Sequence, residues 1–442
     1  MFSVMKKSAF ALTAAISLFA AFAGYRACRR PPLSKAALPA ETASVAAHPS
    51  LLYGRITAVD GAVYEGRIRF GGRQEAFWGD YFNGAKNDNP WAAFVPSTQL
   101  PKRSDPFQIF GLEIFQRESP IDLNRLFIVR FGGLTRIEAI ARDVRVTLKS
   151  GAIFDLGRFE ASDFDDGLRV WDLSRGMTDL DSLRIRLIEL VAPPSSGPDP
   201  GRLHATVQTR HSAFTGFIQW DRELSLGSDT LSGRTAQGDQ KLPFSSIRSI
   251  ARHAPDSSLV TLLDGRQLEL SGSTAAGSAN RGLYVDDPRY GRVLVSWNSF
   301  VSLAFTPASA AGPSYADFPP GSPLLGIVTT HDGRRIDGRI VFDLDESEST
   351  ETLDAPANGV DYTIPFGLVA SIDLPTRAAY ARVTLHNGEH LDLNRSGDLA
   401  AANAGVLIFT GENPRPEYLR WSNVARIQLD RPEAAYPPLP RR

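Results

Sequence analysis

Hydrophobic and polar residues alternate with a period of two through residues 326–343, GIVTTHDGRRIDGRIVFD. This alternation predicts two strands with one shared buried face, because every second side chain of a strand lies on the same side. Asp332-Gly333 separates the two runs and tolerates the positive φ angles of a tight hairpin turn. Gly338 interrupts the second run, and its missing side chain permits a bulge or a sharp bend there. We therefore expect a β-hairpin.

The same pattern recurs along the chain, which indicates internal repeats. Residues 54–70 match it at identical spacing, and residues 207–220 match it with a turn one residue shorter. A second pattern opens with Val-Thr-Leu-x-x-Gly at residues 146–151, 260–265 and 383–388. Both patterns close on hydrophobic residues spaced three apart. We interpret them as about six copies of one module, arranged in three pairs.

Stretches rich in proline and small residues separate these pairs and predict the domain boundaries. Flexible linkers are expected at residues 24–50, 192–201 and 306–323, and a disordered tail at residues 431–442. The predicted domains are β-barrel pair 1 at residues 51–191, which carries a loop insertion, β-barrel pair 2 at residues 202–305 and β-barrel pair 3 at residues 324–430.

The first pattern resembles the Sm-like small β-barrel family over the barrel strands. The first Sm motif is matched by Val328, Asp332-Gly333, Ile336, Gly338, Ile340 and Phe342-Asp343, and the second by Ile364, Val369 and Ile372. The resemblance implies a five-stranded, strongly bent sheet closed on itself, with a short helical turn before the last strand. Pro365-Phe366 replaces the family's Arg-Gly pair, and the acidic loop 343–351 lacks its Asn. RNA binding is therefore not implied.

The predicted fold class is all-β, with tandem small five-stranded barrel-like modules after an N-terminal hydrophobic segment. Closure would remove the exposed edges of each small sheet. A single small barrel is marginally stable, so the two modules of a pair are expected to pack together. The alternative is a six-bladed β-propeller, since six repeats of this size also fit that architecture.

The N-terminus has the features of a targeting segment. Lys6 and Lys7 precede an uncharged run over residues 8–25, and Ala21-Phe22-Ala23 has the small-x-small form of a cleavage site. Residues 1–23 are therefore predicted to be a signal peptide or, if uncleaved, a membrane anchor, with membrane contact only through residues 8–25. We expect an exported protein of the periplasm or cell envelope.

Charge and composition exclude several functional classes. The formal net charge of −1 gives no basic surplus for binding a phosphate backbone, so no nucleic-acid partner is expected. Cys28 is the only cysteine, which excludes an internal disulfide and a cysteine-based metal site. Hydrophobic residues make up 43% of the chain, which is enough for packed cores.

An insertion in the first domain, residues 71–110, departs from the repeat and holds the candidate ligand-binding residues. Trp78, Asp80, Tyr81 and Trp91 combine aromatic rings with a carboxylate, which suits a stacking platform for a sugar or a peptide. The alternative is that the loop folds its aromatic residues onto the barrel as a private core.

Other candidate chemistry is weaker. The acidic residues around Asp163 and around Asp345 lack a full calcium pattern and are expected to lie in solvated loops. His386 and His390 have no evident third ligand, so we predict no metal site, and no cofactor is expected. No catalytic motif is found. The prediction is a non-catalytic secreted or periplasmic repeat protein, a binding or scaffold module with a protein or glycan partner. The alternative is an envelope enzyme acting on glycan or peptide, with its site in the 71–110 insertion.

Overall fold

The computed structural model describes residues 47–71, 73–96, 98–100, 102–109, 112–120, 126–194, 201–308, 312–411 and 415–432. The expected signal peptide or anchor, most of the first linker and most of the C-terminal tail lie outside these ranges. The chain divides into Met1–Ser44 and Val45–Arg442, and everything below concerns the second unit. No helix in the described ranges is long and apolar enough to cross a membrane.

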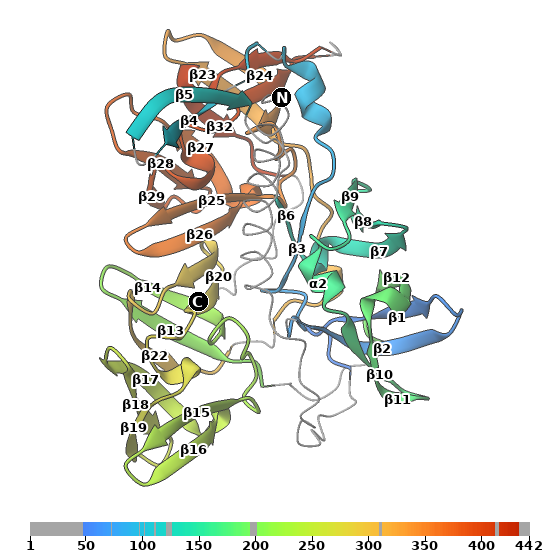
Figure 1. Cartoon of the computed structure of the whole chain (residues 1–442), viewed down its shortest axis with the longest axis vertical. Coiled ribbons are helices and arrows are strands. Elements are labelled where there is room, and N and C mark those ends of the chain that lie inside the picture. Colours follow the sequence, from blue (N-terminus) through green and yellow to red (C-terminus); the bar gives the residue numbers. More distant parts are fainter. Residues whose placement is uncertain are drawn as a thin grey trace, which may run out of the picture. The chain divides into compact units, whose positions relative to one another are not determined.

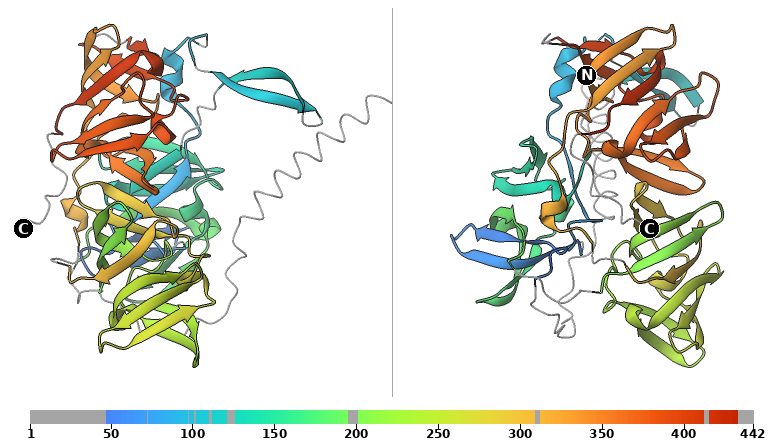
Figure 2. Two further views of the ribbon diagram at one scale, coloured as in Figure 1. Left: turned by 90° about the vertical axis from the view of Figure 1, so that its left-hand side faces the viewer. Right: turned by 180° about the vertical axis from the view of Figure 1, so that it is seen from behind.

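The structure is all-β and antiparallel, as the sequence pattern predicts (Figure 1). The strands form three large sheets and two small ribbons. We call residues 51–191, 202–305 and 324–430 the first, second and third segments. Figure 2 shows from two further sides that the sheets are twisted and that their strands curve. The one α-helix within the described residues is α2 (Ser162–Asp165), and the other helical elements are short 3₁₀ helices.

The first segment forms an eight-stranded sheet in the order β11-β10-β2-β1-β12-β7-β8-β9, and β3 pairs with β6 and β4 with β5 in separate ribbons. Its strands are β1 (Tyr53–Ala58), β2 (Val63–Phe70), β3 (Tyr81–Ala85), β4 (Lys102–Ile109), β5 (Leu112–Pro120), β6 (Leu126–Arg130), β7 (Leu134–Ile140), β8 (Asp143–Leu148), β9 (Ile153–Gly157), β10 (Leu168–Asp172), β11 (Gly176–Leu180) and β12 (Ile185–Leu190). Its 3₁₀ turns are η1 (Pro90–Phe94), η2 (Phe131–Gly133) and η3 (Ser182–Arg184).

The second segment supplies ten strands of a twelve-stranded sheet in the order β16-β15-β19-β18-β17-β22-β13-β14-β20-β21-β26-β25. Its strands are β13 (His204–Thr209), β14 (Ala213–Gln219), β15 (Thr230–Thr235), β16 (Gly238–Pro243), β17 (Ile247–Ala254), β18 (Ser257–Leu262), β19 (Gln267–Ser271), β20 (Leu283–Asp287), β21 (Gly291–Val295) and β22 (Phe300–Phe305). Two 3₁₀ turns, η4 (Phe244–Ser246) and η5 (Thr274–Ala276), belong to it, and η6 (Tyr315–Asp317) follows.

The third segment forms the eight-stranded sheet β29-β28-β27-β32-β23-β24-β30-β31 and lends β25 and β26 to the second. Its strands are β23 (Leu325–Thr330), β24 (Arg335–Phe342), β25 (Thr352–Ala357), β26 (Val360–Pro365), β27 (Val369–Asp373), β28 (Tyr380–Leu385), β29 (His390–Asn394), β30 (Val406–Phe409), β31 (Glu417–Leu419) and β32 (Val424–Leu429). Its 3₁₀ turns are η7 (Phe366–Leu368), η8 (Gly397–Leu399) and η9 (Trp421–Asn423).

The two halves of each segment exchange strands in the same way. The last strand, β12, β22 or β32, lies between the first strand of the segment and the strand that ends its first half. A strand of the second half, β10, β20 or β30, pairs with the second strand of the first half. Each sheet is therefore built from both halves, and none of the sheets is closed into a barrel. Sheets of this size also do not divide into six separate four-stranded blades.

The linker at residues 306–323 does not separate the second sheet from the third segment. Strand β21 pairs with β26 across it, with Val293 opposite Tyr362 and Val295 opposite Val360. Most buried apolar residues of both segments accordingly form one continuous core. A distinct core fills the first segment.

The predicted hairpin at residues 326–343 is confirmed. Strands β23 and β24 pair with Gly326 opposite Gly338, and Gly333 has a φ of 88° in the turn. The residues of the predicted core parity, Val328, Ile336 and Ile340, are all buried. The expected helical turn is also present: η2, η4, η7 and η9 each precede a strand and begin with a buried aromatic residue.

The mid-strand glycine has a specific steric role. A Cβ atom on Gly338 would collide with the carbonyl oxygen of Phe409 in the neighbouring strand β30. Gly66 faces the carbonyl of Trp171 in β10 in the same way, and Gly216 faces that of Asp286 in β20. Only a residue without a side chain lets strands of the two halves approach this closely.

Substitution of Gly338 by alanine should therefore destabilise the protein. The added methyl group forces β24 and β30 apart, at an expected cost of about 1–3 kcal/mol in the free energy of unfolding. Gly133→Ala is the matched control, since its Cβ would meet only Val129 Cγ2 at 3.6 Å. Denaturant unfolding of both variants measures the difference, and equal midpoints would contradict the close-approach role.

Candidate functional site

The four candidate ligand-binding residues lie in the part of the insertion that we call the clasp (residues 73–96). Trp78, Asp80 and Tyr81 are 8%, 1% and 2% exposed, and Trp91 is partly buried. The side chains of the first three residues are covered by protein, so they do not form an open stacking platform. Nor is the clasp a private core, because its side chains contact the second and third segments.

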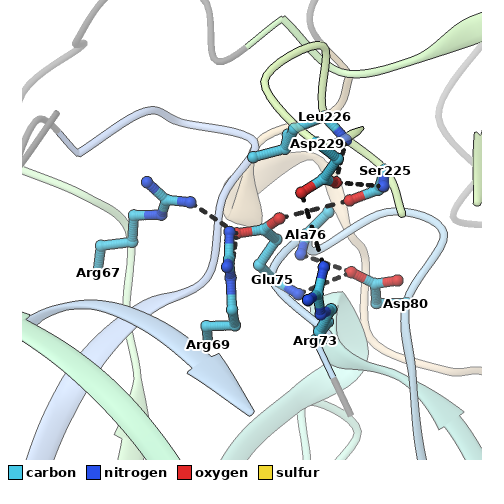
Figure 3. Close-up of polar contacts among 9 residues, drawn as sticks. All are labelled: Arg67, Arg69, Arg73, Glu75, Ala76, Asp80, Ser225, Leu226 and Asp229. Atoms are coloured by element: carbon cyan, nitrogen blue, oxygen red, sulfur yellow. Dashed lines mark hydrogen bonds and ion pairs between the residues drawn. The ribbon is translucent and has the colours of Figure 1, made fainter. Parts of the chain in front are cut away.

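Asp80 anchors the loop between β2 and β3 (Figure 3). Its Oδ2 atom accepts hydrogen bonds from the backbone N–H groups of Glu75 and Ala76, at 2.8 and 2.7 Å. Its other oxygen, Oδ1, accepts a hydrogen bond from the side-chain amide of Gln219 in β14. The first contact fixes the local turn, and the second joins the clasp to the second segment.

The local part of this arrangement recurs in all three segments. Asp229 accepts from the N–H groups of Ser225 and Leu226 at 2.9 Å each. Glu351 likewise accepts from those of Ser347 and Glu348, at 2.6 and 3.0 Å. An acidic residue just before the third strand of each segment therefore caps the preceding loop. The recurrence of an acidic residue at this position could have indicated from the sequence that Asp80 has a structural role.

Burial dominates the electrostatics of Asp80. Loss of solvent raises its pKa to about 6, although the nearby charges of Arg202 and Arg292 and the two backbone hydrogen bonds lower it. Arg202 also donates to the carbonyl oxygen of Trp78 at 3.0 Å, so it holds the backbone on the other side of Gly79.

Asp286, in β20, is the second buried carboxyl group of this contact. It is 1% exposed, and a Cβ atom on Gly79 would collide with its Oδ2. Its Oδ1 lies 3.5 Å from Nε of Arg292, and neither carboxyl oxygen receives a hydrogen bond from the described residues. Burial raises the pKa of Asp286, while Arg292, Arg130 and Arg202 act in the opposite direction.

Arginine side chains stack on the aromatic residues of the clasp. The guanidinium carbon of Arg130 lies 4.0 Å from the ring centroid of Trp78, and its Nε donates to the Tyr81 hydroxyl at 3.0 Å. The guanidinium carbon of Arg292, a residue of β21, lies 4.2 Å from the ring centroid of Tyr81. These cation–π contacts occupy the ring faces that a sugar would otherwise need. We call Trp78, Asp80, Tyr81, Arg130, Arg202, Gln219, Asp286 and Arg292 the Asp80 cluster.

A second ion-pair group lies beside it around Glu75 (Figure 3). Glu75 Oε2 binds Arg67 at 2.6 Å and Arg69 at 2.8 Å. Burial alone would raise the pKa of Glu75, but the two arginines bring it below its ordinary value. From the second segment, Ser225 donates to Oε1 of Glu75 at 3.4 Å, and Asp229 lies 3.7 Å from Arg73.

The later part of the clasp contacts the third segment. Lys86 Nζ binds Oδ1 of Asp345 at 2.7 Å and Oε1 of Glu351 at 3.2 Å. Burial alone would lower the pKa of Lys86, but Glu351 and Asp345 raise it above its ordinary value. Asn89 donates to the carbonyl of Leu344 at 2.9 Å.

Apolar contacts complete this second attachment. Trp91 and Phe94 pack against Phe409 of β30, with ring centroids 6.0 and 5.6 Å apart. Val95 is buried in a small cluster whose other members, Val341, Leu344, Ala404 and Leu407, come from the third segment. The clasp thus presents polar groups to the second segment and mainly apolar ones, with Lys86, to the third.

The two attachment surfaces occupy equivalent positions. In the second segment, Gln219 stands three residues after Gly216, and the backbone of Asp286 faces that glycine. In the third segment, Val341 stands three residues after Gly338, which the backbone of Phe409 faces. The second segment is polar at both positions and the third is apolar. Exchanging the two contacts would bury Asp80 against Val341 without its amide partner, which is costly.

The link after the second segment also folds back onto the clasp. Tyr315 and Phe318 pack against Phe77 and Trp78, with centroids 4.9 and 5.8 Å apart. Lys149 Nζ donates to the carbonyl oxygens of both Tyr315 and Phe318, at 2.5 and 2.9 Å. Burial lowers the pKa of Lys149 to about 8.

The expectation of solvated acidic loops is wrong for Asp163, Asp343 and Asp345, whereas Asp166 is exposed as expected. Asp163 is buried, accepts hydrogen bonds from Gln74 and Asn83, and has its pKa raised by burial to about 6. Asp343 and Asp345 are buried as well, and Asp343 accepts from the backbone N–H of Ala404. These three carboxyl groups are enclosed because the clasp and neighbouring loops cover them. Within the described ranges no group of three or more His, Cys, Asp or Glu is placed to hold a metal ion.

Comparison with known proteins adds no assignment: no family model, no curated protein and no solved structure matches the chain.

Replacing Lys86 by methionine should strongly destabilise the protein. The substitution leaves Asp345 and Glu351 buried without their cation, and breaking a buried ion pair costs about 3–5 kcal/mol. Arg382→Met is the matched control, because it removes a solvent-exposed pair with Asp392 and should leave the unfolding midpoint nearly unchanged. Thermal and denaturant unfolding measure both. Similar midpoints for the two variants would show that Lys86 does not hold the third segment.

Proposed function

We propose that this chain is a non-catalytic repeat protein of the cell envelope that serves as a scaffold and binding module. The observation that carries the proposal is the double attachment of the clasp, through Asp80 to the second segment and through Lys86 to the third. A loop whose polar groups are committed to joining sheets has a structural task. Joined sheets keep a binding surface in a defined shape, which lowers the entropy lost when a partner binds.

The scaffold, in this proposal, consists of about six Sm-like small modules in three pairs. The support is the common strand order of the three segments, in which each half supplies the same strands to the other. Strand exchange between two copies of one module explains why neither copy forms a closed barrel of its own. The proposal covers the architecture and not the RNA-binding chemistry of that family.

The first segment is the best candidate for contact with a partner. Eleven of the fourteen exposed large hydrophobic side chains among the described residues belong to it. Val59 and Leu183 are 66% and 68% exposed and lie at the same end, since the N–H of Val59 donates to the carbonyl of Arg184 at 2.9 Å. Exposed apolar groups that gather on one part of a protein favour a protein partner.

Charged substitutions at this end should therefore abolish partner binding. In the Val59→Asp, Leu183→Asp double variant, proteins that co-purify with the wild-type chain from envelope extracts should be lost, while the unfolding midpoint is kept. Leu263→Asp, at a 57% exposed position in the second segment, serves as the control. An unchanged set of co-purifying proteins in the double variant would refute this surface.

Export remains part of the proposal and rests on the N-terminal sequence. If residues 1–23 are a cleaved signal peptide, N-terminal sequencing of the chain recovered from the envelope should begin at Gly24. A chain that begins at Met1 and stays with the membrane would instead support the uncleaved anchor.

The competing proposal is an envelope enzyme that acts on glycan or peptide through the 71–110 insertion. One observation favours it: the pKa of Asp80 near 6 is of the kind found in general acids and bases. Against it stand the 1% exposure of Asp80 and the commitment of both its oxygens to hydrogen bonds within the protein.

A further inference from the structure

Strands β21 and β26 join the second and third segments in a nearly symmetric way. Val293 pairs with Tyr362 at the centre of this joint. Each of the two stands four residues before the buried aromatic residue in the turn after its strand, which is Trp297 after β21 and Phe366 after β26. The pairs on either side of the centre are arranged symmetrically around it. Equivalent positions of two related strands therefore meet, as they would if one strand paired with a copy of itself.

Strand β11 of the first segment corresponds to β21. Thr178 pairs with β10 as Val293 pairs with β20, and it stands four residues before Ser182, the first residue of η3. Strand β21 has β26 on its outer side, whereas β11 is an edge strand that pairs only with β10 among the described strands (Figure 1). No described strand thus occupies on β11 the position that β26 occupies on β21.

The other edge strands of the three large sheets are covered or contain residues that oppose pairing. The clasp bridges β9 through Lys86 and Leu156, and β29 lies against β25. Strand β25 contains Pro356, which has no N–H group to donate, and β31 has only three residues and follows Pro416. Strand β16 exposes Lys241. Strand β11, in contrast, contains neither proline nor lysine.

Charge explains why β16 of the same chain does not fill this edge in the way that β26 fills β21. Gln240 is the equivalent central residue of β16, because it stands four residues before Phe244, which begins η4. In the register of the β21–β26 joint, Asp239 of β16 would then lie opposite Asp179 of β11. Like charges directly opposite each other destabilise a strand pair.

A second copy of β11 meets no such conflict. In the same register Thr178 would face Thr178 of the other copy, and Met177 would face Asp179 on both sides of the symmetry axis. A pair of threonines is favourable across antiparallel strands, and no two like charges are opposed.

Apolar surface also favours pairing at β11. Met177 is 56% exposed, and Leu173, in the turn before the strand, is 76% exposed. By comparison, β15 and β16 expose no large hydrophobic side chain. Removal of apolar surface from water therefore favours contact at β11 rather than at β16.

We propose that β11 pairs antiparallel with β11 of a second copy of this chain, with the two Thr178 residues opposite each other. The result is a symmetric dimer in which one continuous sheet runs through both first segments. It repeats between two chains the joint that β21 and β26 make within one chain. The dimer goes beyond the proposed scaffold function and does not depend on it.

Two substitutions at Met177 test the register, because their expected effects are opposite. Met177→Asp puts a carboxylate opposite Asp179 of the other copy, twice in a symmetric dimer, and should raise the dissociation constant about tenfold. Met177→Lys puts an ammonium group there and should lower the dissociation constant by a similar factor. Since Met177 is exposed, the unfolding midpoint of both variants should stay close to that of the wild type.

Sedimentation of the purified full-length chain in detergent measures both constants. The protein mass of the wild type should double from the 48.2 kDa of one chain as its concentration rises. A wild type that stays monomeric, or variants that dimerise exactly as the wild type does, would overturn the proposal.

Cysteine cross-linking locates the contact. In a Cys28→Ser background, which has no other cysteine, Thr178→Cys should bring two thiols together, since opposite residues of antiparallel strands have Cβ atoms about 4.5–5.5 Å apart. Mild oxidation should then give a covalent dimer. Gln240→Cys, at the equivalent position of β16, is the matched control and should remain a single chain. Cross-linking at position 240 instead of 178, or at neither position, would refute the pairing of β11.

Discussion

Backbone contact at the mid-strand glycines is the constraint on which the rest of the structure depends. At Gly66, Gly216 and Gly338, the carbonyl group of a strand from the other half occupies the space of a side chain. This approach brings β10, β20 and β30 against β2, β14 and β24. Without it, each half would be an incomplete sheet with an exposed edge. The exchange of strands thus rests on the smallest residue at one position of each repeat.

Charge placement then decides how the segments are joined. The outer positions beside the glycines carry Gln219 and Asp286 in the second segment but Val341 and Phe409 in the third. The clasp has a polar residue, Asp80, where it meets the second segment and an apolar residue, Trp91, where it meets the third. Hydrogen bonds and ion pairs are directional, so the polar contact selects its own partner, and a misplaced carboxylate would remain buried without one. The result is a joint with considerable buried charge.

Hairpins, tight turns, the buried parity of the strands and the helical turn before the closing strands could all be predicted from the sequence, because each depends on neighbours within a few residues. Asp332-Gly333 sets its turn locally, and Val328 and Ile340 share a face by geometry alone. The segment that breaks the repeat could also be recognised from the sequence. Its character was not predictable, because burial of Trp78 and Tyr81 depends on Arg130 and Arg292, which are far away in the chain. The acidic stretches were misjudged for the same reason.

The sequence by itself determined the kind of structure: an all-β chain of repeated hairpins, with glycine where two backbones meet and one region set apart from the repeat. Tertiary structure alone decided which strands pair, since the same alternating pattern fits a closed module or two halves that exchange strands. It also decided that Asp80 and Lys86 bind other segments of the chain rather than solvent or a ligand. Hydrophobic periodicity specifies which face of a strand is buried, but the identity of the neighbour depends on contacts between residues more than a hundred positions apart, such as Asp80 with Gln219 and Lys86 with Asp345.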